Sequence, residues 1–494
     1  MATQQPAPTQ EPAKITPRAT DFAAWYQDVI AAAELAESAP VRGCIILRPN
    51  GYAIWEAIQR QLDDRFKSLG IRNAYFPVFI PESFIRREAE HVEGFSPELA
   101  VVTHAGGEQL EEPLVVRPTS ETIIWASYKR WIRSHRDLPL LLNQWSNVVR
   151  WEKRPRAFLR TTEFLWQEGH TAHATPEEAR AFARTMLGVY SDFADEVLAL
   201  APLPGEKPPH ERFAGAVATF SIEPMMQDGR ALQAGTSHDL GQNFARAFDV
   251  TYQTEEGDAR LVSAASWGVS TRLVGGVVMA HGDDTGCVFP PLLAPVQVAI
   301  VPILGRNEAS ARTALDAAQT AEAALRDAGL RTAVDDRAGV RPGAKYFEWE
   351  RRGAPLRLEI GPRDVAKGQA IAATRHDGQK RPVPLSGLAT AAQALLDEVQ
   401  AELRTRAHAF REQHTTTVED REALTEAVAQ GYALARWCEN PGCAQEMQQD
   451  TRATVRCFPF ERTNGELAPL PDDPGPCAWC GQPAARRVIV ARAY

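Results

Sequence analysis

Two runs of alternating side chains, separated by a short basic segment, constrain the fold of this chain more than any other feature. The first run covers residues 144–152 and the second covers residues 158–168. The segment between them, KRPRA at 153–157, contains a proline that a central strand excludes because it cannot donate a ladder hydrogen bond. Alternation with a period of two predicts strands, so the sequence predicts an antiparallel hairpin with a basic loop at its tip.

The predicted hairpin brings four side chains of complementary chemistry to one place, namely Arg150, Glu152, Phe158 and Arg160. A guanidinium fork suits a phosphate or a carboxylate, and a phenyl ring suits stacking on a base. A carboxylate beside them can accept from an exocyclic amine. The set predicts a nucleotide site. The same residues could form an Arg–Glu cross-strand pair on a solvated hairpin with Phe158 in the core, and the hairpin alone does not separate these interpretations.

Length, charge and cysteine content exclude several classes of protein. A chain of 494 residues is too long for one hydrophobic core, so we expect about two to four domains. The net charge of −9 provides no overall attraction for nucleic acid, which would have to bind local basic patches. No apolar run reaches the length of a membrane span, and the seven cysteines do not suggest a secreted disulfide framework. We therefore expect a cytoplasmic globular protein with no membrane partner.

Two later stretches place polar side chains where ligands commonly bind. Gln233, Thr236 and His238 lie at the end of an alternating segment that turns at a glycine. Ser270 and Arg272 begin a helix of small residues, and a helix N-terminus with an arginine is a natural anion site. Each has a structural alternative, since a lone histidine is often a core residue and Arg272 could form a structural salt bridge.

Four cysteines near the end of the chain have the spacing of metal ligands. Cys438 and Cys443 form one close pair, Cys477 and Cys480 form another, and 33 residues separate the pairs. Two close pairs of thiolates in an intracellular chain predict a tetrahedral structural zinc site, because four protein ligands leave no open position for catalysis. The alternative is four reduced thiols without a metal.

Patterning also predicts the architecture on either side of the hairpin. Ile54, Ile58, Leu62, Phe66 and Leu69 form one apolar stripe of a helix, which is followed by an extended segment over 71–81. After about residue 295, strands and helices alternate, which predicts an α/β domain with a largely parallel sheet. The chain therefore belongs to the α/β class, with an α+β portion around the hairpin.

Arg-x-Glu, a basic loop and Phe-x-Arg together resemble motif 2 of the class II aminoacyl-tRNA synthetases. RPTSE at 117–121 and WQEGH at 166–170 resemble the prolyl-tRNA synthetases in particular, in the form that lacks a large editing insertion. The helix and strand over 54–81 resemble motif 1, which implies a homodimer, and residues 261–284 resemble motif 3. The resemblance runs from about Thr20 to Tyr494.

The resemblance implies a domain order. A disordered tail over 1–19 precedes a class II catalytic domain over 20–290, built on an antiparallel sheet flanked by helices. An α/β anticodon-binding domain follows over 291–400, and a small C-terminal zinc-binding domain covers 401–494.

The resemblance also implies the activity and the residues that perform it. The enzyme would activate L-proline with ATP and Mg²⁺ to prolyl-adenylate and transfer the prolyl group to the 3′ end of tRNA(Pro), with Arg150 and Arg272 as catalytic residues. The implied proline-binding residues are Thr119, Glu121, Arg150, Trp166, Glu168, His170 and His238, with Phe213 in the pocket wall. The implied ATP-binding residues are Arg150, Glu152, Phe158, Arg160, Thr161, Gln233, Thr236, Ser270 and Arg272. The implied anticodon-binding residues are Glu350, Arg357 and Arg363.

Several of these residues have structural alternatives, and the activity has rivals. Thr119 and Glu121 could cap a helix, Glu350 could lie on a solvated helix face, and Arg357 could be a charged strand end. The rival functions are a class II synthetase of another specificity, threonyl being nearest, and a non-catalytic synthetase-like tRNA-binding or regulatory protein. About 110 residues separate motif 2 from motif 3, too few for an inserted editing domain, so we expect misactivation of alanine or cysteine without hydrolytic correction within this chain.

Overall fold

The computed structural model describes residues 14–89, 99–305 and 307–494, which group into two compact units. Unit 1 contains the described residues up to Glu37, residues 46–57 and residues 277–405, and unit 2 contains residues 38–45, 58–276 and 406–494. Most of the tail expected over 1–19 lies outside the described residues. The chain crosses between the units within β1 (Ala36–Ser38), β2 (Ile45–Leu47), α2 (Pro49–Ser68), α7 (Arg272–His281) and α11 (Leu388–Gln413).

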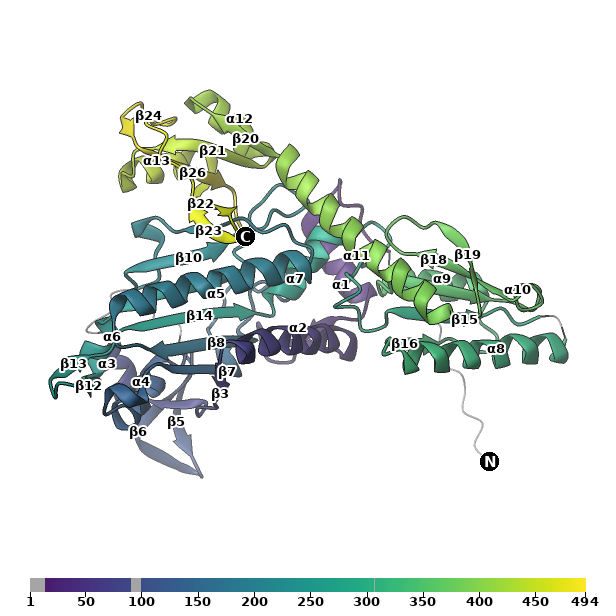
Figure 1. The fold of residues 1–494 in the computed structure, drawn as a ribbon, viewed down its shortest axis with the longest axis horizontal. Helices are drawn as coiled ribbons and strands as arrows, with labels where there is room; N and C mark the ends of the chain where they lie inside the picture. Colours follow the sequence, from purple (N-terminus) through teal and green to yellow (C-terminus); the bar gives the residue numbers. More distant parts are fainter. Residues whose placement is uncertain (1–13, 90–98, 306) are drawn as a thin grey trace. The chain divides into compact units, whose positions relative to one another are not determined.

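The centre of unit 2 is a sheet that has twelve strands among the described residues (Figure 1). In spatial order the path is β20 (Thr415–Val418), β21 (Tyr432–Trp437), β26 (Arg486–Ala491), β22 (Thr454–Thr463), β9 (Pro204–Glu206), β10 (Ala218–Ile222), β11 (Gly235–Gly241), β14 (Ala264–Ser270), β8 (Glu163–Ala172), β7 (Leu140–Val149) and β3 (Arg72–Asn73), and β23 (Glu466–Pro469) pairs with β22. The run from β9 to β7 is antiparallel throughout. This confirms the expected antiparallel sheet.

Helix α5 (Pro176–Glu196) covers one face of this sheet along β10, β11 and β14 (Figure 1). The Thr175 side chain accepts from the Glu178 amide and Pro176 occupies the first turn, so the helix begins where its orphan donors are satisfied. Ala179, Ala183 and Met186 are buried at helical spacing. An apolar stripe on α5 therefore packs on the strands that carry the site.

The predicted hairpin is confirmed as β7 and β8, which pair antiparallel with Gln144 opposite Glu168 and Ser146 opposite Trp166. The predicted extent of its strands was wrong, because their pairing ends with Val149 opposite Glu163. Residues 150–162 form the loop instead. Phe158 adopts a left-handed φ of 61°, which is incompatible with the extended run predicted there.

Smaller elements complete unit 2. Its helical segments are α3 (Glu82–Ala89), α4 (Glu121–Trp131), the 3₁₀ turns η1 (His135–Asp137) and η2 (Pro209–Glu211), α6 (Asn243–Phe248), α12 (Arg421–Gln430) and α13 (Pro441–Thr451). Its small sheets pair β4 (Phe79–Pro81) and β5 (Val101–Ala105) with β6 (Glu108–Val116), β12 (Thr251–Gln253) with β13 (Ala259–Leu261), and β24 (Gly475–Pro476) with β25 (Pro483–Ala484).

The C-terminal residues extend the central sheet. β22 pairs antiparallel with β9, with Phe458 opposite Glu206 and Pro459 opposite Gly205. A separate apolar core, which includes Trp437, Met447 and Val488, lies among the C-terminal helices and strands. The C-terminal segment therefore has its own core and shares backbone hydrogen bonds with the strands that carry the site.

Unit 1 contains α1 (Phe22–Ala32) and a sheet whose order is β16 (Thr332–Val334), β15 (Val298–Pro302), β17 (Leu356–Ile360), β18 (Gln369–Thr374) and β19 (Lys380–Pro384). Its other helices are α8 (Glu308–Asp327), α9 (Pro342–Arg351) and α10 (Pro362–Val365). β15 is parallel to β16 and β17, but β18 and β19 pair antiparallel. The expectation of a largely parallel sheet holds for three strands only, because the connections after β17 and β18, of eight and five residues, are too short for parallel crossovers and return the chain antiparallel.

None of the helices described combines the length and apolar character that a membrane crossing requires.

Candidate functional site

A cavity of about 300 Å³ lies in unit 2 beside the strands β8, β10, β11 and β14. It brings together most of the side chains predicted to bind proline or ATP. Those that line it are Thr119, Glu121, Arg150, Trp166, Glu168, His170, Phe213, Gln233, Thr236, His238, Ser270 and Arg272. Thr119 and Arg272, which are 153 residues apart in the sequence, thus line one space.

One wall of the cavity is acidic. Oxygens of Glu121 and Glu168 and a ring nitrogen of His170 all lie within 4.8 Å of one another. The Thr119 hydroxyl donates to Glu121, and Glu168 accepts from the Ser120 amide at 3.2 Å and from Gln144 Nε2 at 2.9 Å. Two buried carboxylates held in this way form a site for a small cation.

The arginine of the hairpin loop faces the same space without an ion-pair partner among the described residues. Arg150 Nε donates to the carbonyl oxygen of Pro118 at 2.9 Å, and its guanidinium lies 5.7 Å and 5.3 Å from the ring centroids of Phe164 and Trp166. These contacts orient the fork, and Glu121 and Glu168 attract its charge without forming a direct ion pair with it among the described residues. The cavity therefore presents a guanidinium and two carboxylates that are not directly paired.

Two histidines of the cavity have opposite electrostatic environments. Burial, with repulsion from His170, lowers the pKa of His238 to about 3, so the ring is neutral at neutral pH. Its nitrogens lie 3.0 Å and 3.1 Å from the hydroxyls of Thr219 and Thr236. Burial also opposes the charged form of His170, but its hydrogen bond to Glu168 and the charge of Glu121 outweigh it and raise the pKa of His170.

A second cavity of about 270 Å³ in unit 2 is strongly basic. Its lining is Glu152, Arg154, Arg156, Leu159, Arg160, Arg230, Arg272, Ala493 and Tyr494. Arg272 lines both cavities, and its Nη1 and Nε donate to the carbonyls of Gln233 and Leu159 at 3.2 Å and 3.3 Å. Burial, with repulsion from Arg160, lowers the pKa of Arg272 to about 10, which leaves it charged at neutral pH. An anion of several charges would find donors in both spaces.

Two residues predicted to bind ATP do not line either cavity. Phe158 is buried, with 2% of its surface exposed. Thr161 is also buried, and its hydroxyl donates to the Glu163 carbonyl at 2.7 Å. The loop conformation decides both positions, which the alternation of the sequence could not predict.

Sequence reasoning missed a buried charge cluster next to the site. Lys207, which lines the cavity, lies 2.8 Å from Glu223, and Arg456 Nη2 donates to the other oxygen of Glu223 at 2.9 Å. Burial would raise the pKa of the Glu223 carboxyl, but the charges of Lys207 and Arg456 outweigh it and lower the pKa. In the sequence, only the charge of Glu223 beside residues patterned as a buried strand could have indicated this cluster.

The four predicted metal-ligating cysteines converge. Cys438 Sγ lies 3.6 Å from Cys480 Sγ, Cys443 Sγ lies 3.8 Å from Cys477 Sγ, and all four sulfurs lie within 4.8 Å of one another. A tetrahedral zinc with bonds of about 2.3 Å requires sulfur separations of about 3.8 Å. The separations of 3.6 Å and 3.8 Å are compatible with this geometry, and none of the seven cysteines forms a disulfide.

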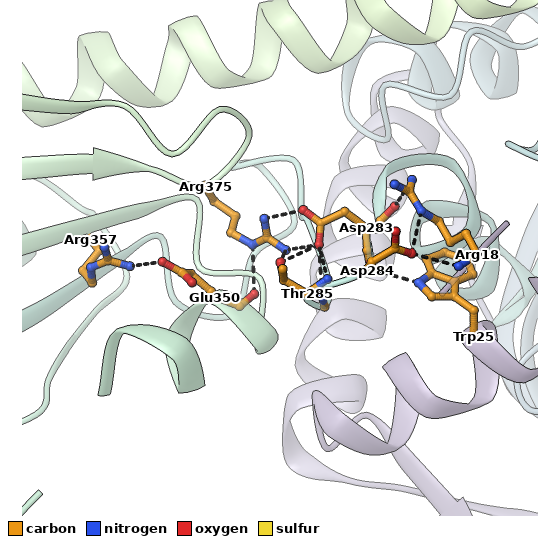
Figure 2. Close-up of polar contacts among 10 residues, drawn as sticks. Arg18, Trp25, Asp283, Asp284, Thr285, Glu350, Arg357 and Arg375 are labelled. Carbon is orange, nitrogen blue, oxygen red and sulfur yellow. Dashed lines mark hydrogen bonds and ion pairs between the residues drawn. The ribbon is translucent and has the colours of Figure 1, made fainter. Parts of the chain in front are cut away.

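A cavity of about 350 Å³ in unit 1 contains two of the three predicted anticodon residues, Glu350 and Arg357 (Figure 2). Arg357 Nη1 donates to Glu350 at 2.7 Å, and Glu359 lies 3.1 Å from Arg357 Nη2. The Arg357 guanidinium stacks 4.3 Å from the Tyr346 ring centroid. The third predicted residue, Arg363, lies exposed on α10 and does not line this cavity.

Comparison with protein families first defines the class. Residues 103–281 match the tRNA synthetase class II core domain (G, H, P, S and T), residues 297–395 match an anticodon binding domain, and residues 421–494 match the C-terminal domain of prolyl-tRNA synthetase. The chain therefore has the catalytic core of a class II aminoacyl-tRNA synthetase, and it carries an anticodon-binding domain.

Full-length relatives then define the family. The proline–tRNA ligase of Chlorobium phaeovibrioides is 52% identical over 97% of this chain and 99% of its own length, and proline–tRNA ligase 2 of Rhodococcus jostii is 53% identical over 97% and 98%. The crystal structure of prolyl-tRNA synthetase from Cryptosporidium parvum, complexed with halofuginone and AMPPNP, superposes with a TM-score of 0.90 at 39% identity, covering 97% of this chain and 99% of that chain. This chain belongs to the prolyl-tRNA synthetase family. Its activity is the ligation of proline to tRNA, so both rival functions are excluded.

Proposed function

We propose that the 300 Å³ cavity of unit 2 binds L-proline as a zwitterion. The observation that carries this proposal is the separation of charge, with Glu121 and Glu168 on one wall and an unpaired Arg150 facing the same space. The secondary ammonium of proline would bind to Thr119 and Glu121, and its carboxylate to Arg150. Trp166, His170, Phe213 and His238 would enclose the ring, with His238 neutral so that it does not repel the ammonium.

ATP would occupy the adjoining basic space with Mg²⁺ on its phosphates. Arg150 would bridge the proline carboxylate and the α-phosphate, so that it offsets their repulsion and stabilises the charge that develops during in-line attack. Arg160 and Arg272 would bind the remaining phosphates, and Glu152 would accept from the adenine amine. Gln233, Thr236 and Ser270 would complete the ATP site, while Phe158 and Thr161 would act by holding the loop. No side chain acts as a nucleophile in this scheme.

Transfer would follow at the same place. The 3′-terminal hydroxyl of tRNA(Pro) would attack the carbonyl carbon of prolyl-adenylate and release AMP. The cluster of Arg154, Arg156 and Arg230 beside the first cavity supports approach of the phosphate backbone near that end. A net charge of −9 makes such local patches necessary.

The cavity would discriminate by exclusion, since its walls reject larger side chains but gain little against smaller ones. Misactivation of alanine or cysteine follows, because each missing methylene of a substrate in an apolar pocket lowers kcat/KM only by about 10- to 200-fold. The chain between β8 and β11 forms α5, β9, η2 and β10, which supports the absence of an editing domain inserted between motifs 2 and 3.

The cavity of unit 1 would read anticodon bases. Glu350 and Arg357 offer a carboxylate and a guanidinium to base edges, and Arg363 would contribute from the exposed helix α10. Unstacked anticodon bases present their Watson–Crick edges for such hydrogen bonds.

The four-cysteine cluster would hold a structural zinc. Its sulfur separations support tetrahedral coordination, and no further position would remain for substrate. A metal there would fix α13 and the segment around Cys477 and Cys480 and would supply no chemistry to the reaction.

The enzyme would act as a cytoplasmic homodimer with no membrane partner. Large apolar side chains just after α2 support an interface between copies, since Tyr75 is 71% exposed and Phe79 is 46% exposed. Seven unpaired thiols are consistent with the reducing cytoplasm.

Amino-acid-dependent ATP–pyrophosphate exchange without tRNA tests the proposed site. We expect strong exchange with proline, weak exchange with alanine and cysteine, and none with the larger amino acids. Glu121→Gln should raise KM for proline more than KM for ATP, because it removes charge from the ammonium wall only. Equal effects on both KM values would contradict the assignment of that wall to proline.

A further inference from the structure

A chain of ion pairs and hydrogen bonds (Figure 2) includes three residues that line the cavity of unit 1, namely Asp283, Thr285 and Arg375. Its centre is Arg375, which follows β18 and whose side chain is only 6% exposed. Both Nη atoms of Arg375 donate to the Asp283 carboxylate at 2.7 Å, and Nη2 also donates to the Thr285 hydroxyl at 3.0 Å. The fourth contact differs in kind, since Nε donates to the main-chain carbonyl of Glu350 at 2.9 Å.

Asp283 is itself held rigidly. Its carboxylate accepts from the Thr285 amide at 2.8 Å, from the Thr285 hydroxyl at 2.6 Å and from the Gly286 amide at 3.1 Å. Partial burial opposes ionisation, but the hydrogen bonds and charge of Arg375 and the hydrogen bonds from Thr285 outweigh it and lower the pKa of Asp283 to about 2. The carboxylate is therefore charged throughout the physiological range.

The turn that carries Asp283 is also fixed from the N-terminal side of unit 1. The indole nitrogen of the fully buried Trp25 donates to the Asp283 carbonyl at 2.9 Å. Arg18 donates its amide and Nε to Asp284 Oδ1 at 2.9 Å and 3.1 Å, and its Nη1 to the Gly282 carbonyl at 3.1 Å (Figure 2). The partner of Arg375 thus has little freedom to move.

Glu350 lies in the last turn of α9, where main-chain carbonyls lack helical partners. The Glu350 carbonyl accepts from the Gly353 amide at 3.1 Å, and the Arg375 guanidinium adds a charged donor that opposes the negative end of the helix dipole. The Glu350 side chain extends from the same residue and accepts from Arg357 at 2.7 Å. Arg375 therefore helps to fix the main chain from which the Glu350 carboxylate reaches Arg357.

We propose that Arg375 and Asp283 form a positioning pair for the recognition of anticodon bases by Glu350 and Arg357. The inference rests on the proposed role of Glu350 and Arg357 in reading the anticodon. Arg375 lines the cavity, but we assign it a supporting role because four of the five N–H donors of its guanidinium already bond to Glu350, Asp283 and Thr285. Its effect on tRNA selection passes through the geometry of Glu350, and small displacements of such groups cost large factors in rate.

Aminoacylation of two transcripts tests the pair. One transcript is tRNA(Pro). The other carries a substitution at one anticodon base, chosen because the wild-type enzyme discriminates against that substitution and Glu350→Gln discriminates less. For Arg375→Lys and Asp283→Asn we expect kcat/KM for the native transcript to fall about tenfold. For the same variants, kcat/KM for the substituted transcript and the rate of proline-dependent pyrophosphate exchange should stay within about twofold of the wild-type values. The ratio between the transcripts therefore shrinks, which a purely structural role would not produce.

The matched control is Arg381→Lys, which alters another bidentate ion pair of unit 1, with Glu398 at 2.8 Å and 2.7 Å, away from the Glu350 carbonyl. It should leave both transcripts and exchange unchanged. Arg375→Lys and Asp283→Asn preserve side-chain size, and their melting temperatures are compared with the control.

The possible results separate the two hypotheses. An equal loss for both transcripts, a parallel loss of exchange, or failure of both variants to fold overturns the positioning role. If Glu350→Gln narrows discrimination and neither Arg375→Lys nor Asp283→Asn does, the positioning pair alone is wrong. If Glu350→Gln leaves discrimination intact at every anticodon position, the proposed anticodon role of Glu350 fails and the positioning pair fails with it.

Discussion

The cavity of unit 2 and the cavity of unit 1 hold their arginines and carboxylates in different arrangements. In the cavity of unit 2, Arg150 has no ion-pair partner among the described residues although Glu121 and Glu168 line the same space. In the cavity of unit 1, Arg357 is paired with Glu350 at 2.7 Å and with Glu359 at 3.1 Å. Separated charges suit a ligand that carries both signs, such as a free amino acid. Paired charges present oriented donors and acceptors, which suits uncharged base edges.

The charged residues at the two cavities also differ in exposure. Lys207, which lines the unit 2 cavity, and its partners Glu223 and Arg456 have side chains 1%, 0% and 8% exposed, whereas Glu350, which lines the unit 1 cavity, is 37% exposed. Activation of proline requires charges fixed against solvent, because their interaction weakens in water. Recognition of a macromolecule tolerates a surface that the ligand itself will cover.

Removing a thiolate from the four-cysteine cluster should have the largest effect, and that effect should fall on unit 2. Structural zinc contributes about 10–16 kcal/mol of apparent binding free energy in small domains, so Cys443→Ser should abolish stoichiometric zinc and lower the melting temperature strongly. β22 pairs with β9, so exchange activity should fall as well. Elemental analysis and thermal melts check this, with Cys44→Ser, a half-buried cysteine outside the cluster, as control. Wild-type protein without zinc would contradict it.

Breaking the buried charge cluster should have the next largest effect. Glu223→Gln leaves Lys207 and Arg456 buried without their anion, which costs about 3–5 kcal/mol. The matched change Glu398→Gln removes a pair whose side chains are 38% and 46% exposed and should cost less than about 1 kcal/mol. Thermal and urea denaturation measure both. Equal losses of stability in the two variants would contradict the expected difference between the buried charge cluster and the exposed ion pair.

Arg150→Lys should lower kcat/KM for pyrophosphate exchange by about 10²–10³-fold with little change in melting temperature. A lysine keeps the charge but cannot bridge two oxyanions with a planar fork. The control is Arg312→Lys, a surface arginine 83% exposed on α8, which should leave exchange unchanged. A loss below about fivefold would indicate that charge alone suffices, and the contrast with the paired Arg357 would weaken.

The smallest expected effect is a difference between the pKa of His170 and the pKa of His238. The pKa of His238 near 3 lies below the usual 6.5, so its neutral form contributes stability that is complete above pH 6.5 and declines as pH falls toward 3. The pKa of His170 is raised, so its contribution is present below pH 6.5 and is lost as pH rises through the folded value. NMR titration of ¹⁵N-labelled histidine, assigned with His170→Gln and His238→Gln, measures both. A His238 that titrates near 6.5 would show that the cavity is more solvated than its geometry indicates.

Local patterning was sufficient for the elements and for much of the site. The period of two predicted β7 and β8, and the capping residues Thr175 and Pro176 mark the start of α5. The paired spacing of the four cysteines indicated their convergence. These features depend on residues close in sequence, whose periodicity and chemistry act before any long-range contact forms.

Tertiary structure alone decided which charges meet. Only folding brings Lys207, Glu223 and Arg456 together from three separate segments, and only folding leaves Arg150 unpaired while Arg357 is paired. Phe158 is buried because its loop takes a left-handed turn, and Arg363 lies apart from Glu350 because α10 carries it outward. Sequence patterns specify which face of an element is apolar, but the partner of a charged side chain depends on distances across the fold, and those distances set its energy.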